Sequence, residues 1–114
     1  MDGTTFTPTT TADDTNRLAV SSAATLFSHA GSDHRCKLNK NAAADTAALL
    51  FQTGWSGRAE MGLTGSDDFR INVSANGATW KPALVIDRAS GAVSLPNTPQ
   101  PVSLIHAQSL TTQG

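Results

Sequence analysis

The chain has 114 residues, a formal net charge of −1, 15% charged residues and 5% aromatic residues with no tyrosine. This length suits a single domain, and a nearly neutral charge without a basic stripe excludes electrostatic binding to nucleic acid. The sequence lacks both a run of about 18 apolar residues, which a membrane span needs, and the N-terminal pattern of an export signal. So few aromatic side chains predict a thin core that other copies of the chain must complete, and we therefore expect an oligomer.

Residues 1–15 form a polar, threonine-rich lead that includes Phe6. Such a segment cannot bury enough apolar surface to order itself. We expect an extended N-terminal arm, either loose or laid along a partner subunit with Phe6 as its contact. Asp13 or Asp14 is placed to cap a turn within this arm.

Two short segments that follow are predicted to be strands. Residues 17–20 place Leu18 and Val20 on the inward side, because side chains alternate along a strand. Residues 21–27 are compatible with a helical turn or a strand, and the Thr-Leu-Phe sequence at their end favours the strand. Both segments would open a β-domain that we expect over residues 16–96.

A third strand is predicted from His34 to Lys40, after a glycine-centred turn. Alternation places Cys36 and Leu38 on its buried face, so we expect the thiol to be buried and unreactive. Because Cys36 is the only cysteine, an intrachain disulfide is excluded.

His29, His34 and Cys36 are the most ligand-like group in the chain, with Asp33 as a fourth donor. Zinc sites prefer tighter pairs such as Cys-x2-Cys, and the sequence has no second pair. We therefore favour histidines without a chemical role, expect no cofactor, and keep a metal site as a remote alternative.

The stretch from Ala47 to Pro96 consists of short apolar runs separated by glycine-bearing turns. Turns spaced every 8–12 residues or so predict an all-β fold, an antiparallel β meander or sandwich. From Phe69 to Ser74 apolar and polar side chains alternate, so that strand has one apolar and one polar face. Asn76-Gly77 predicts a two-residue type I′ hairpin. Pro82 predicts a strand that is at an edge, is bulged, or begins after the proline.

The segments on either side of this stretch are predicted to be irregular. Residues 41–46 are too few for a stable helix, so we expect a loop or one turn. Residues 97–114 contain two prolines that end the meander, and we expect a C-terminal tail that adds a strand to a neighbour or moves freely.

No group of residues predicts catalysis. Asp67–Asp68 and Asp87 lie in turn sequences, where aspartate bonds its own backbone. Glu60 is expected to pair with Arg58 or Arg70 across strands. The sequence contains neither a Gly-x-Ser-x-Gly elbow nor a glycine-rich phosphate loop before a helix. We therefore expect no enzyme activity and assign no catalytic residue.

Two tryptophans are the remaining candidates for contact with a partner. Trp55 lies in the tight turn 54–57, where burial within one copy is difficult, so it is predicted to contact another subunit or to serve as a platform for a sugar. Trp80 lies in a predicted strand and is expected in the core. Phe6, Trp55 and Trp80 are together the candidates for anchoring the chain in an oligomer or on a particle.

Four runs of the sequence are similar to known proteins: NRLAVSS, TLF, FQTGWSGRAEMG and ALVIDRASG, at residues 16–22, 25–27, 51–62 and 83–91. They resemble a β-rich segment of tail-fibre and head-spike surface proteins from alphaproteobacterial tailed phages and gene transfer agents. The resemblance implies an exposed virion structural protein, made in the host cytoplasm and oligomeric, with a homotrimer expected. Its partners would be its own copies and virion proteins such as the major capsid or tail proteins. This chain is shorter than those fibre proteins, which favours capsid decoration or a fibre base.

These observations support three functional hypotheses. The first is a virion structural protein, a capsid decoration or short fibre or spike component that attaches by multivalent contacts. The alternative is a receptor module of a tail fibre that binds a host surface polysaccharide through Trp55. The remote alternative is a metal-dependent enzyme at His29, His34 and Cys36.

Overall fold

The computed structural model describes residues 11–99, in two units that comprise residues 11–36 and 37–99. The first unit contains no helix or strand among its described residues. Asp13 organises a turn there, as predicted: its Oδ1 accepts hydrogen bonds from the backbone N–H groups of Thr15 and Asn16. The bond from the Asn16 backbone is the main reason that the pKa of Asp13 lies below its ordinary value. Phe6 and the first ten residues lie outside the described part of the chain.

The strands predicted before residue 41 are wrong. The chain is irregular over residues 17–20, 21–27 and 34–40, and Leu26 is 86% exposed. Cys36 is exposed as well, so the expected buried thiol is also wrong. The physical reason is that a strand persists only where a neighbouring strand accepts its backbone hydrogen bonds.

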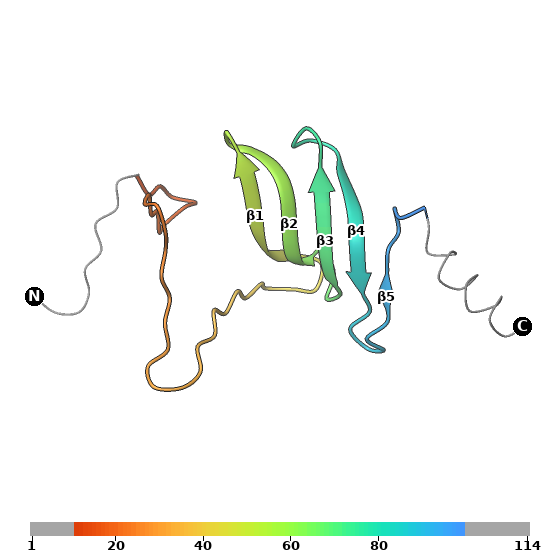
Figure 1. Ribbon diagram of the computed structural model, residues 1–114, viewed down its shortest axis with the longest axis horizontal. Helices are drawn as coiled ribbons and strands as arrows, with labels where there is room; N and C mark the ends of the chain where they lie inside the picture. The colour runs from red at the N-terminus through yellow and green to blue at the C-terminus, as the bar shows by residue number, and fades with distance from the viewer. Residues whose placement is uncertain (1–10, 100–114) are drawn as a thin grey trace, which may run out of the picture. The chain divides into compact units, whose positions relative to one another are not determined.

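The second unit is a single antiparallel sheet (Figure 1). It contains five strands, each hydrogen-bonded to the next along the chain: β1 (Thr46–Thr53), β2 (Ser56–Thr64), β3 (Phe69–Ser74), β4 (Trp80–Ile86) and β5 (Val93–Ser94). The predicted all-β meander is therefore confirmed, in the form of one layer. Residues 41–45 before β1 form a turn, as predicted.

The type I′ geometry occurs at a different hairpin from the predicted one. Between β1 and β2 the two loop residues are Gly54 and Trp55, with φ values of 55° and 68°, and positive φ at both positions is the type I′ signature. Between β3 and β4 only Gly77 has positive φ. There the Oδ1 of Asn76 accepts hydrogen bonds from the backbone of Ala78 and Thr79, which builds a longer loop.

Pro82 lies at a bulge in β4, as predicted. Asn72 pairs with Pro82 while Ile71 pairs with Leu84, so Ala83 is the extra residue. The other side of Pro82 is not paired by β5, which reaches only Val85 and Ile86. A proline is tolerated at such a position, because the bulge already interrupts the ladder.

Asp87 begins the turn between β4 and β5, again as predicted. Its Oδ1 accepts hydrogen bonds from the backbone N–H groups of Ala89 and Ser90, and its carbonyl accepts one from Gly91. The bond from the Ser90 backbone is the largest cause that lowers the pKa of Asp87 below its ordinary value.

Gly62 in β2 is required by its backbone conformation and by its surroundings. A Cβ at this position would lie 2.4 Å from the carbonyl oxygen of Ala47 and 2.8 Å from Cα of Ala48, at a φ of +145°. Gly62→Ala is therefore expected to lower the free energy of unfolding by about 2–4 kcal/mol, measured by urea unfolding at a fixed protein concentration.

Gly65→Ala is the matched control for Gly62→Ala. Gly65 also has positive φ (+72°), but a Cβ there meets nothing within 4 Å, so its loss should be about 1 kcal/mol. Equal losses at Gly62 and Gly65 would contradict the clash as the cause.

Candidate functional site

One face of the sheet is apolar, and none of its described side chains is fully buried. The register aligns its side chains in three cross-strand rows, Leu49–Met61–Ile71–Leu84, Phe51–Ala59–Val73–Lys81 and Ala47–Leu63–Phe69–Ile86–Val93. We call these rows the apolar face. Its one charged member is Lys81, at the end of a row. Residues paired across antiparallel strands point to the same side of a sheet, so the rows form one continuous surface.

The apolar face is accessible, and the described residues supply no apolar core beneath it. No described hydrophobic residue is buried, and Leu49, Phe51 and Val73 are 49%, 51% and 42% exposed. An apolar surface that is continuous over several strands marks an interaction site. A single-layer sheet has no other place to bury these side chains.

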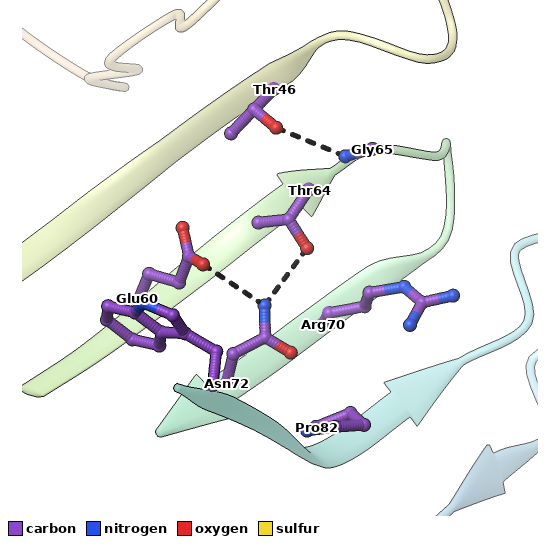
Figure 2. A pocket seen from close by; sticks show the side chains of 8 residues that line it. Thr46, Glu60, Thr64, Gly65, Arg70, Asn72 and Pro82 are labelled. Atoms are coloured by element: carbon purple, nitrogen blue, oxygen red, sulfur yellow. Dashed lines mark hydrogen bonds between the residues drawn. The ribbon is translucent and has the colours of Figure 1, made fainter. Parts of the chain in front are cut away.

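The opposite face, which we call the polar face, carries most of the polar side chains of the sheet beside Leu50, Trp80 and Val85. It has a hollow of about 370 Å³. Figure 2 shows the side chains that line it, from β1 to β4 and the loop after β2: Thr46, Glu60, Thr64, Gly65, Arg70, Asn72, Trp80 and Pro82. Among the residues that line it, Asn72 is the most enclosed, with 9% of its surface exposed. We call this the polar hollow.

Hydrogen bonds hold the Asn72 side chain in a defined orientation. Its Nδ2 donates to Oε2 of Glu60 at 3.4 Å and to Oγ1 of Thr64 at 3.1 Å. The Oγ1 of Thr46 accepts a hydrogen bond from the backbone of Gly65 at 3.1 Å and closes the rim. The polar hollow is therefore built from side chains that the sheet positions.

Glu60 does not pair with an arginine, so that prediction is wrong. The Nη1 of Arg58 donates to Oγ of Ser56 and to the carbonyl of Gly57. The Nε of Arg70 is buried without a hydrogen-bond partner among the described residues. Cross-strand pairing explains this, since the partner of Glu60 on β3 is Asn72.

The structure places the two tryptophans in different surroundings. Trp80 is half-buried at the polar hollow. The prediction that it lies in a core is therefore wrong. A Cβ at Gly57 would lie 2.8 Å from Cζ2 of Trp80, which shows that the indole packs over that glycine. Trp55 is 88% exposed at the tip of the β1–β2 hairpin. This agrees with the prediction that a tryptophan in this turn is hard to bury within one copy of the chain.

Trp55→Gly is expected to raise the free energy of unfolding by about 1 kcal/mol, because glycine tolerates positive φ and tryptophan does not. The exposed indole contributes little packing that would be lost. Chemical denaturation measures the gain, and Trp55→Ala is the control, because alanine removes the indole but keeps the strained Cβ. A loss of stability in Trp55→Gly would show instead that the indole holds the hairpin.

The three residues of the remote metal-site alternative, His29, His34 and Cys36, come together only in part. Sγ of Cys36 lies 3.7 Å from Nε2 of His34, and the rings of His34 and Phe27 stack with their centroids 6.2 Å apart. Nδ1 of His29 instead accepts a hydrogen bond from the backbone of Gly31. Within residues 11–99 no group of three or more histidine, cysteine or acidic side chains has an arrangement that could hold a metal ion.

No protein-family model matches the chain, and no curated protein or solved structure does. The part of the chain that the structure describes also contains no helix that is long and apolar enough to cross a membrane.

Proposed function

We propose that this chain is a structural protein of a virion or phage-like particle, a capsid decoration or a short fibre or spike component. The observation that carries the proposal is the apolar face, which lies on a folded sheet whose described residues include no buried hydrophobic side chain. Such a sheet becomes stable when a second layer covers its face. A virion component is present in many copies, so a neighbouring copy of the same chain can supply the second layer.

The partner for this face is another copy of the same chain. Two sheets stack face to face about 10 Å apart and interdigitate their side chains, and three such sheets around an axis enclose a triangular core. Lys81 lies at the end of its row, so symmetric copies can pack without placing a charge at the centre. The expected homotrimer corresponds to the arrangement of three sheets around an axis.

Attachment to the particle would then be mechanical. An oligomer displays its arms and strand edges several times, and several weak contacts to capsid or tail proteins add up to lasting attachment. The resemblance to fibre and spike proteins supports the virion surface as the place where this happens.

A host-glycan receptor module is the second candidate. The observation that favours it is Trp55, an exposed indole held at positive φ at a hairpin tip. Strained and exposed positions of this kind are enriched at binding sites. Loss of adhesion to host cells in Trp55→Ala particles would support this candidate over decoration alone.

Light scattering coupled to size-exclusion chromatography tests the proposed assembly. At micromolar concentration we expect a mass that is a multiple of the 11.8 kDa chain, with three copies expected. A folded monomer under these conditions would contradict the proposal. Images of intact particles with the chain labelled would then place it on the head or on the tail.

A further inference from the structure

We propose that the polar hollow is a binding site for a hydroxylated carboxylate, the chemistry of a sugar acid. Arg70 would bind the carboxylate, Asn72 and Glu60 would accept hydrogen bonds from hydroxyl groups, and Trp80 would offer an apolar surface to the C–H side of the ligand. The site lies on the face opposite the apolar face, so it does not depend on the proposed function.

Arg70 provides the first argument. Its Nε is buried and has no hydrogen-bond partner among the described residues. Its cross-strand neighbours, Gly62 on β2 and Val85 on β4, carry no acceptor side chain, and the described residues contain no ion pair to Arg70. A guanidinium that lines the polar hollow without an ion pair is suited to a planar carboxylate, which accepts two parallel hydrogen bonds.

Asn72 provides the second argument. Both of its described side-chain hydrogen bonds use Nδ2, toward Glu60 and Thr64. Its Oδ1 therefore remains as an acceptor, and Figure 2 shows that it turns to the side where Arg70 lies. An acceptor that is nine-tenths buried and fixed in orientation selects a ligand that brings a donor, such as a hydroxyl group.

The rest of the lining disfavours a doubly charged anion. The carboxylate of Glu60 lies beside Asn72 and repels a dianion such as phosphate, while it can accept from a hydroxyl group. Trp80 and Pro82 add an apolar wall. The hollow of about 370 Å³ is shallow and largely open to solvent, which suits a small hydrophilic ligand. A single sugar-acid unit combines one negative charge, several hydroxyl donors and an apolar side.

Titration with D-glucuronate tests the site, with intrinsic fluorescence in the Trp55→Gly background as the readout, where Trp80 is the sole tryptophan. We expect a saturable change with glucuronate, and at least roughly tenfold weaker binding of glucose, which lacks the charge, and of acetate, which lacks the hydroxyls. Equal binding of acetate and glucuronate, or no saturable change, would overturn the proposal. A polymer of uronic acid that binds more tightly than the monomer would assign the ligand to an acidic polysaccharide, and equal binding per unit would assign it to the free acid.

Arg70→Gln is expected to weaken glucuronate binding by roughly tenfold or more. Arg88→Gln is the matched control, since Arg88 is exposed in the β4–β5 turn, and it should bind as the parent does. Circular dichroism and the oligomeric mass confirm that each variant folds and assembles. If Arg70→Gln does not fold, Asn72→Asp replaces it, because a second carboxylate beside Glu60 should repel the ligand. Unchanged affinity for glucuronate in the folded variant would overturn the proposed binding site. A monomeric protein that still binds glucuronate would contradict the proposed oligomer but not the binding site.

Discussion

Leu49→Asp is expected to convert the assembled protein into a monomer. Leu49 begins the row that crosses the apolar face through Met61, Ile71 and Leu84. In the assembly a carboxylate at this position would be buried without a partner, which costs about 3 kcal/mol or more per copy. The dissociation constant should therefore rise by roughly a hundredfold or more, as measured by analytical ultracentrifugation over a dilution series.

Leu50→Asp is the control that the sheet itself provides. Leu49 and Leu50 are neighbours in β1 with nearly equal exposure, 49% and 52%, but successive side chains in a strand point to opposite faces. The same change at Leu50 therefore adds a charge to the polar face and should leave the oligomeric mass unchanged. If both variants dissociate, the polar face also takes part in assembly. If neither does, the apolar face is not the interface.

The sheet could be predicted where the sequence carries both alternation and turns. The alternation from Phe69 to Ser74 predicts one apolar and one polar face, and the register confirms them. Leu18 and Val20 show the same alternation, but they lie in an irregular segment. Alternation describes how a strand would be buried, whereas the existence of the strand depends on a neighbour that pairs with it.

The polar hollow could not be predicted from the sequence for a related reason. Glu60 and Asn72 become neighbours only through the β2–β3 register, and a bulge decides which residue of β4 lies opposite Asn72. Charge complementarity favours Glu60 with an arginine, but the pleat sets which side chains share a face. The sequence predicts the tight turn at Gly54-Trp55, but not its type I′ geometry, because tryptophan is a rare choice at positive φ.

Lys40 has a structural role that its sequence context conceals. Its side chain is 8% exposed, and Nζ lies 3.1 Å from Oδ1 of Asp67. Nζ also donates to three carbonyl groups, those of Ala43 at 2.7 Å, Asp45 at 3.0 Å and Ser66 at 2.7 Å. The ammonium group thus ties the turn before β1 to the loop between β2 and β3. This tie stabilises one end of the edge strand β1, whose backbone is paired on one side only.

Lys40→Ala is expected to lower the free energy of unfolding by about 2–3 kcal/mol, because it removes the charged hydrogen bonds and the ion pair that the nearly buried Lys40 side chain makes. Lys40→Met keeps most of the aliphatic stem and removes only the ammonium group. The loss of stability that both variants show is therefore due to the ammonium group. Lys37→Ala removes the same charge at an exposed position of the same unit and should change stability by less than about 0.5 kcal/mol. Urea unfolding at one protein concentration compares the three variants, since assembly makes stability depend on concentration. A loss in Lys37→Ala as large as that in Lys40→Ala would mean that net charge, and not this hydrogen-bonded tie, sets the stability of the sheet.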